Sequence, residues 1–315
     1  MSDGRPGEKR VTMAFCTDFN DILCISSILT YCLYIYSNPI STPTVRGIRL
    51  IERKAHMSRR ILWINPVGFD AYDKPISDAL RDEAFPDTRI DVCSLKGVSM
   101  QHLEYNAYEM VAAGPTMGAI RWGELQGYDA AVIGCFYDPF LRAARELTRT
   151  MAVTAPAEAS LHIASTLGER ISILVGRSKW IPEMHENVVK YGFQDRIASF
   201  RKLRMTVSEF QKDPACTEER ILEEAHKAVE EDGADVIVLG CTIEFGFYKK
   251  IQEELGVPVI DALVAPLRYA ELLADIRKRQ NWGISNALGY ETPDQAEMDA
   301  WVPIIEPNIY RDPRG

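Results

Sequence analysis

The sequence predicts an α/β protein of two similar lobes, each a parallel sheet flanked by helices. From residue 60 onward, short apolar runs of strand length alternate with segments of helical spacing, a pattern typical of strands buried on both faces in βαβ units. The pattern Asp, four apolar residues, Gly, Cys also occurs twice, at residues 129–135 and 235–241. We therefore expect a duplicated unit whose lobes are related by a pseudo-two-fold, with the active site in the cleft between them.

The elements of the first lobe follow from its apolar runs and their boundary residues. The expected strands are residues 61–64, 90–95, 130–134 and the region of Val153, and the expected helices are residues 75–85, 102–113, 138–150 and 156–167. Gly114-Pro115 is expected to end the second helix. Asp138 as N-cap, with Pro139 at the first helical position, predicts the start of the third.

The second lobe repeats this order. The expected strands are residues 171–175, 236–239 and 257–260, and the expected helices are residues 180–191, 217–231, 244–255 and 263–279. The strand at Ile171 corresponds to that at Ile61, and Cys241 to Cys135, at a nearly constant offset. We expect residues 58–155 plus 262–282 to form the first lobe and residues 156–261 the second. The tail, residues 283–315, is expected to cap a lobe or to contact a partner chain.

Residues 1–57 depart from this pattern and are expected to be an N-terminal extension that is disordered or not part of the fold. Residues 22–36 are apolar or weakly polar but fall short of the ~20 residues needed to span a bilayer. Asp18 and Asp21 precede them, which disfavours a signal peptide. The segment from Met57, MSRRILWINP, is typical of a natural start, so the extension is consistent with a start codon assigned too early. A membrane-targeting segment is the alternative.

Composition and charge exclude several classes of protein. The 315 residues include 36 Lys+Arg and 45 Asp+Glu, so the net charge is −9, whereas a nucleic-acid binder needs clustered basic residues. The seven Cys residues form no close pairs, so no disulfide framework is predicted and a reducing cytoplasm is expected. We expect a small-molecule substrate and no nucleic-acid or membrane partner, and a homo-oligomer is compatible with the sequence.

Cys135 and Cys241 are the candidate catalytic residues. Both follow a predicted strand, at the sheet edge where ligands bind in open parallel sheets, and both precede a predicted helix whose N-terminus would favour the thiolate. If the lobes face each other, the two sulfurs flank one cleft, which suits proton abstraction from one face of a carbon and delivery to the other without a cofactor. The alternative is that each is a small buried core residue. No metal site is expected, because no His or Cys lies at ligand spacing near either sulfur.

Other polar residues are expected to have structural roles. His162 and His185 are expected to pack or to lie on helix surfaces, Glu158 to complement a helix dipole, and Cys93 and Cys216 to be structural or exposed. No GxGxxG, Walker A, HExxH or GxSxG pattern is present, which argues against the common nucleotide, zinc-protease and serine-hydrolase classes.

Several segments together resemble one family. They are Ile64-Asn65-Pro66, Gly114-Pro115, Gly134-Cys135-Phe136-Tyr137-Asp138-Pro139, Glu158-Ala159-Ser160, Val238-Leu239-Gly240-Cys241-Thr242 and residues 255–261. The chain from about Arg59 to Arg279 resembles the aspartate/glutamate/hydantoin racemase superfamily, most of all its hydantoin and allantoin racemase branch. The resemblance implies a cofactor-independent racemase with two α/β lobes and Cys135 and Cys241 as a two-base pair. Backbone N–H groups after each Cys, with Asn65 and Thr242, would hold the substrate's oxygens, and Pro66 and Phe136 are further substrate-binding candidates.

The chain also departs from this branch. Val67-Gly68 stands where the branch usually has Asn and then Ser or Thr. After Gly114-Pro115, this chain has Met117-Gly118-Ala119-Ile120-Arg121 where the family often carries an acidic residue followed by Ser. The substrate therefore stays open between a 5-substituted hydantoin or allantoin-like compound and an aspartate- or glutamate-type amino acid. Cis-trans isomerisation of a diacid, malonate decarboxylation and non-enzymatic binding are further alternatives. An Arg, a Lys or several hydroxyls in the pocket would favour a dicarboxylic amino acid, and apolar walls would favour a substituted ring.

Overall fold

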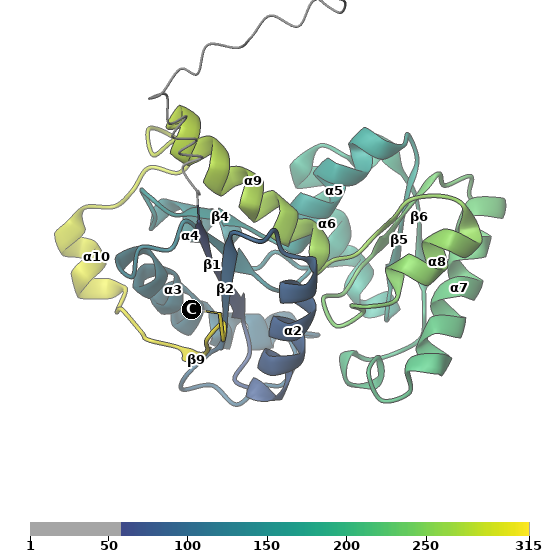
Figure 1. Ribbon diagram of the computed structural model, residues 1–315, viewed down its shortest axis with the longest axis horizontal. Helices are drawn as coiled ribbons and strands as arrows, with labels where there is room; N and C mark the ends of the chain where they lie inside the picture. Colours follow the sequence, from purple (N-terminus) through teal and green to yellow (C-terminus); the bar gives the residue numbers. More distant parts are fainter. Residues whose placement is uncertain (1–57, 315) are drawn as a thin grey trace, which may run out of the picture. The chain divides into compact units, whose positions relative to one another are not determined.

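The protein forms two β-sheets flanked by helices, as the sequence predicts (Figure 1). The computed structural model describes residues 58–314. The expected extension at residues 1–57, with its apolar segment, lies outside the described residues. Within residues 58–314, no helix combines the length and apolar character needed to cross a bilayer.

Each sheet is built around four parallel strands. In the first sheet the order is β4-β3-β1-β2-β9, and in the second it is β6-β5-β7-β8. The first sheet comprises β1 (Arg59–Asn65), β2 (Thr88–Ser94), β3 (Ala130–Ile133), β4 (Ala152–Thr154) and β9 (Asn308–Tyr310); the second comprises β5 (Ile171–Val175), β6 (Ile197–Lys202), β7 (Val236–Leu239) and β8 (Val259–Ile260). The two orders agree if β9 is left out, β1, β2, β3 and β4 are matched with β5, β6, β7 and β8, and one order is read from its other end.

Helices connect the strands in both sheets. They are α2 (Asp73–Glu83), α3 (Asn106–Leu125), α4 (Leu141–Glu146), α5 (Pro156–Leu167), α6 (Ile181–Tyr191), α7 (Pro214–Glu230), α8 (Tyr248–Leu255), α9 (Val264–Gln280) and α10 (Gln295–Trp301). The helix after the fourth strand of each sheet crosses to the other sheet: α5 packs on β7 and β8, whereas α9 packs on β1, β3 and β4. Because α5 and α9 also pack on each other, they join the two lobes. The lobe boundaries and the pseudo-two-fold stay predictions.

The repeated sequence pattern performs the same structural task in both lobes. The carboxylate of Asp129 accepts a hydrogen bond from the backbone N–H of Arg60 at 2.8 Å, and that of Asp235 accepts one from Arg170 at 2.7 Å. Each Asp therefore ties the start of one strand to the start of its neighbour. The four apolar residues that follow are buried in both β3 and β7.

The prediction that Gly114-Pro115 ends a helix is wrong. The expected helix at residues 102–113 begins at Asn106 instead, and α3 continues through Pro115 to Leu125. Pro115 removes one backbone hydrogen bond, to the carbonyl of Val111, and Val111 is exposed, so solvent can satisfy that carbonyl. The following segment, 118–123, is buried against the sheet and the tail, and this packing outweighs the helix-breaking tendency.

The prediction that Asp138 caps the next helix is also wrong. Asp138 has a φ of +49°, and α4 begins only at Leu141. Its carboxylate instead accepts the backbone N–H groups of Ala157 and Glu158, both at 2.8 Å, in the first turn of α5. Asp138 is therefore a capping residue for a different helix, one that follows it by almost twenty positions.

Two strands were not predicted. β6 is only half-buried along its length and ends in Arg201 and Lys202, so it lacks the apolar run that marks the other strands. β9 belongs to the tail and pairs antiparallel with β2 at the sheet edge.

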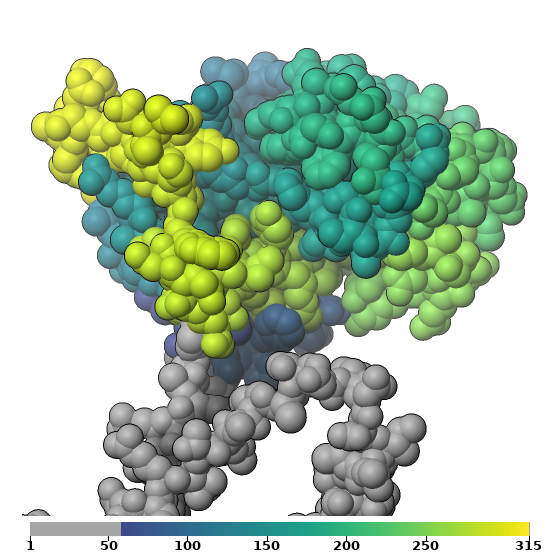
Figure 2. Space-filling view, turned by 90° about the horizontal axis from the view of Figure 1, so that it is seen from above, coloured from purple at the N-terminus to yellow at the C-terminus, as the bar shows by residue number. Residues whose placement is uncertain are grey.

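The tail packs on the first lobe. Figure 2 shows it in yellow over that lobe and clear of the green second lobe. Arg121 of α3 donates to the carbonyl of Met298 at 2.7 Å and pairs with Asp299. A Cβ at Gly118 would lie 2.6 Å from Ile305, so only glycine allows the tail to approach α3 this closely. The segment that departs from the racemase pattern thus holds the tail.

Candidate active site

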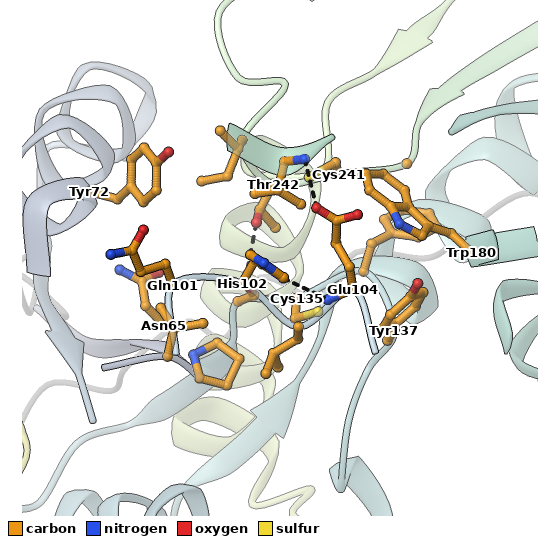
Figure 3. Close-up of a pocket in the computed structure, with 18 of the residues that line it drawn as sticks. Asn65, Tyr72, Gln101, His102, Glu104, Cys135, Tyr137, Trp180, Cys241 and Thr242 are labelled. Atoms are coloured by element: carbon orange, nitrogen blue, oxygen red, sulfur yellow. Dashed lines mark hydrogen bonds between the residues drawn. The ribbon is translucent and has the colours of Figure 1, made fainter. Parts of the chain in front are cut away.

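All six candidate site residues line one pocket between the lobes (Figure 3). They are Asn65, Pro66, Cys135, Phe136, Cys241 and Thr242. About 630 Å³ of space free of protein atoms lies in and at the mouth of this pocket, part of it open solvent. Its lining comes from the segments that follow β1, β2 and β3 in one lobe and β5, β6 and β7 in the other. Both lobes therefore contribute the carboxyl ends of their strands.

The two cysteines have matching backbone surroundings. The sulfur of Cys135 interacts with the backbone N–H of Tyr137, and that of Cys241 with the backbone N–H of Ile243, in each case two residues further along the chain. A turn follows each cysteine, and α4 and α8 begin only several residues later. The expectation that each cysteine directly precedes a helix is therefore wrong, and local N–H groups take the place of a helix terminus.

The glycine before each cysteine is required by close packing. At Gly134 a Cβ would lie 2.5 Å from Trp63 Nε1, and at Gly240 it would lie 2.4 Å from the carbonyl oxygen of Leu174. The backbone N–H groups of both glycines continue the sheet, donating to Ile64 at 2.8 Å and to Leu174 at 2.7 Å. Each cysteine is thus held at a fixed distance from the neighbouring strand.

Both thiols favour the protonated form. Burial, reinforced by the carboxyl group of Glu109, raises the pKa of Cys135 well above its usual value, and the N–H of Tyr137 offsets this only in part. Burial and the carboxyl group of Glu244 likewise raise the pKa of Cys241. The sequence-based expectation of a favoured thiolate is therefore wrong, because desolvation outweighs the few N–H dipoles.

Asn65 is held firmly at the end of β1. Its Oδ1 accepts the Trp63 indole N–H at 2.9 Å, and its Nδ2 donates to the buried Asp73 carboxylate at 2.6 Å. Burial raises the pKa of Asp73 to about 6, although the hydrogen bond from Asn65 opposes this. One N–H of the Asn65 amide remains for a ligand.

The departure at Val67-Gly68 also has a structural reason. Val67 lines the pocket as an apolar residue. A Cβ at Gly68 would lie 1.9 Å from the carbonyl oxygen of Val98, so no other residue fits there without movement of the backbone.

Hydrogen bonds connect the lobes around the pocket. The hydroxyl of Thr242 donates to the carbonyl of Gly134 at 3.2 Å, which places a second-lobe side chain on the first-lobe cysteine segment. Glu104, buried in the pocket wall, pairs with Arg177 of the second lobe at 2.6 Å. These contacts fix the two cysteine segments relative to one another.

Sequence reasoning missed several residues that line the pocket. Tyr72 and Trp180 lie in short 3-10 helices, Asp70–Tyr72 and Ser178–Trp180, that follow the first strand of each lobe. Gln101, His102 and Glu104 follow β2, and Tyr137 follows Cys135. The repeat itself carried a usable signal, since the segments after matching strands meet at the same pocket.

A pair of carboxyl groups also spans the lobes close to Cys135. Glu109 of α3 meets Glu183 of α6, and burial together with Glu183 raises the pKa of Glu109 to about 9. The two can share a hydrogen bond only when one of them is protonated, so the pair holds a proton at physiological pH.

The remaining candidate residues lie outside the pocket. His162 packs against the rings of Phe193 and Tyr269, and Glu158 forms an ion pair with Arg145 at 2.6 Å. Cys93 is buried and Cys216 is half-buried. Residues 58–314 contain no group of three or more His, Cys, Asp or Glu side chains placed to hold a metal ion.

The chain is similar to known racemases in sequence and in fold. A family model described as Asp/Glu/Hydantoin racemase matches residues 61–270. A hydantoin racemase of Pseudomonas sp. (strain NS671) is 36% identical, over 76% of this chain and 93% of its own, and one of Paenarthrobacter aurescens is 33% identical, over 76% and 99%. The solved structure of an allantoin racemase from Klebsiella pneumoniae is 31% identical, covers 76% of this chain and 95% of its own, and has a TM-score of 0.69.

Proposed function

Because this chain belongs to the Asp/Glu/hydantoin racemase family, within its hydantoin and allantoin racemase branch, and is an isomerase of the racemase type, we propose that it racemises 5-substituted hydantoins with Cys135 and Cys241 as its two bases. The observation that carries this proposal is that both sulfurs line the same pocket, from opposite lobes, with N–H groups in matching positions.

The pocket walls support a neutral ring as the substrate. Most of the lining side chains are apolar or aromatic, among them Tyr72, Ile76, Leu103, Phe136 and Met184. No Arg or Lys occurs among the described residues that line the pocket, so a free α-carboxylate or a diacid finds no guanidinium or ammonium group there. A hydantoin is uncharged and offers carbonyl and N–H groups, which suits these walls better than an amino acid does.

In the proposed reaction, one cysteine thiolate removes the proton from C5 of the ring. The electron pair of the broken C–H bond delocalises into the adjacent carbonyl, and the thiol of the other cysteine then protonates C5 on the opposite face. The enzyme ends with its two sulfurs in exchanged protonation states. Because burial raises the pKa of both thiols, the thiolate is scarce but is a stronger base towards a weakly acidic carbon.

The developing enolate oxygen needs hydrogen-bond donors. In this proposal, the free N–H of the Asn65 amide and the backbone N–H groups after each cysteine, that of Thr242 among them, supply them, while Pro66 and Phe136 shape the walls. A preorganised donor of this kind typically contributes ~3–4 kcal/mol to transition-state stabilisation. The remaining proposals are that the protein acts on a small molecule without a nucleic-acid or membrane partner, that homo-oligomers can form, and that the protein is cytoplasmic, where its free thiols stay reduced.

The test is deuterium uptake in D₂O at the carbon next to the carbonyl group, with a panel of hydantoins, aspartate, glutamate and an arylmalonate, after subtraction of spontaneous exchange. We expect exchange and racemisation only with hydantoins, and Cys135→Ser and Cys241→Ser should each abolish racemisation while leaving the circular dichroism spectrum unchanged. Full racemase activity in either variant would refute the two-base assignment, and activity on an amino acid alone would refute the substrate class.

A further inference from the structure

The pocket contains two buried hydrogen-bond donors that have no partner. They are the hydroxyl of Tyr137 and the indole N–H of Trp180, whose residues line the pocket and are 6% and 2% exposed. Within residues 58–314, neither polar atom has a hydrogen-bond partner. A donor that is both buried and unpaired is costly, so two of them in the wall of one pocket indicate that a group outside the protein satisfies them.

Both side chains are held in place by the second lobe. The Asn187 amide donates to the carbonyl of Tyr137 at 2.5 Å and fixes this turn. The ring of Trp180 packs so closely on Gly176 that a Cβ there would lie 2.4 Å from it, and it meets the ring of Phe210 edge-on. Burial, followed by the adjacent Cys135, raises the pKa of Tyr137 above its usual value, so its hydroxyl stays protonated and can donate.

The position of the two donors indicates which part of the substrate they meet. Figure 3 shows Tyr137 and Trp180 on one side of the pocket and Asn65, Gln101 and Tyr72 on the other, with the cysteines between them. In the proposed reaction, C5 lies between the two sulfurs and the enolate oxygen points towards Asn65. The substituent on C5 then extends towards Tyr137 and Trp180.

We propose that Tyr137 and Trp180 form a subsite for a hydrogen-bond acceptor on the 5-substituent, such as the carbonyl oxygen of an amide or ureido group. This inference rests on the proposed function and adds the substituent class to it. Met184 and Val207 also line the pocket, so an alkyl substituent fits by size but leaves both donors unpaired. A site built to hydrogen-bond a substrate group discriminates strongly against analogues that lack it.

The experiment uses two hydantoins whose substituents match in size and branching, 5-(carbamoylmethyl)hydantoin and 5-isobutylhydantoin. We expect kcat/KM of the wild-type enzyme to favour the carbamoylmethyl compound by about a hundredfold, the effect of two net hydrogen bonds. Tyr137→Phe and Trp180→Phe should each lower this ratio by about tenfold. Ser160→Ala is the matched control, because it removes a buried hydroxyl that has no partner but does not line the pocket.

The outcomes separate this inference from the proposed function. Turnover of both hydantoins without preference in the wild-type enzyme would overturn the subsite, and this measurement needs no variant that folds. A wild-type preference that persists in Tyr137→Phe and Trp180→Phe would also overturn it, since the two donors would then be satisfied by water. Absence of turnover with every hydantoin would refute the proposed function, and the subsite with it.

Discussion

Each lobe carries an acidic residue three positions after its cysteine, but the two residues have different surroundings. Asp138 accepts hydrogen bonds from the backbone of Ala157 and Glu158 and from the hydroxyl of Tyr191 at 2.8 Å. Glu244 is fully buried, and neither of its carboxyl oxygens has a well-formed hydrogen bond within the described residues.

The difference follows from which residue caps the crossing helix. In the first lobe Asp138 receives the N–H groups at the start of α5. In the second lobe Asp261 has this role, accepting from Leu263 at 2.7 Å and Val264 at 3.2 Å at the start of α9. Glu244 does not cap a helix. It lies beside Cys241, where burial and the nearby Asp261 raise its pKa well above the usual value. The duplicated backbone is thus preserved while its carboxyl groups have diverged.

The largest expected effect tests whether the two halves act on opposite faces of the substrate. In D₂O, Cys135→Ala and Cys241→Ala should each lower racemisation by at least ~10²-fold, because each removes one acid/base group. Each variant should still exchange the C5 proton of one enantiomer, and the two variants should prefer opposite enantiomers. Chiral chromatography with mass spectrometry measures both quantities.

Cys216→Ala is the control for these variants. Cys216 is a half-buried thiol outside the pocket, so its removal should alter neither racemisation nor exchange. If both active-site variants exchanged the same enantiomer, the sulfurs would not face opposite sides of the substrate, and the functional equivalence of the two halves would fail.

A second comparison concerns stability. Asp138→Ala leaves two buried N–H groups and the Tyr191 hydroxyl without an acceptor and should lower the free energy of unfolding by ~3 kcal/mol. Asp261→Ala should have a similar effect, because it removes the corresponding cap of α9. Asp138→Asn keeps one acceptor oxygen and should cost less. Urea denaturation measures all three, and a negligible loss in Asp138→Ala would contradict the capping role.

The duplicated architecture was predictable because it leaves a local signature. Asp129 and Asp235 mark the start of β3 and β7, and the Gly-Cys pair marks their ends, so the two matching strands and the placement of Cys135 and Cys241 at one pocket follow from sequence. The continuation of α3 through Pro115 was not predictable, because it depends on tertiary packing of the helix against the sheet and tail. The cap supplied by Asp138 depends on a distant helix, which no local pattern reveals.

The candidate site was predictable only where a residue adjoins a recognisable strand end. Asn65 and Thr242 are of this kind. Trp180 and Glu104 enter the pocket from segments whose paths are set by packing between the lobes, and nothing in their sequence neighbourhood marks them. The pKa of the cysteines was predicted in the wrong direction, because the sequence indicates nearby N–H dipoles but not the degree of burial.

The last prediction concerns Glu244 alone. Its carboxyl group is neutral in the folded protein and ionised in the unfolded chain above the ordinary pKa of 4.5, so the folded state binds the extra proton. The stability this provides is full below that pH and is lost as the pH rises towards the raised pKa of the folded state. Between about pH 5 and about pH 8, the free energy of unfolding should therefore fall less steeply with rising pH in Glu244→Gln than in the wild type. The two slopes should differ by up to about 1.4 kcal/mol per pH unit.

Urea denaturation at several pH values measures this slope, with Glu253→Gln, at an exposed position, as the control. Burial raises the pKa of Asp138 to about 7 and that of Asp261 to about 6, so both groups also titrate in this range and add to the slope of both proteins. The difference between the two slopes reports the titration of Glu244 together with its interaction with Asp261. Identical slopes would mean that Glu244 is ionised when folded, and the two halves would then differ in hydrogen bonding but not in charge.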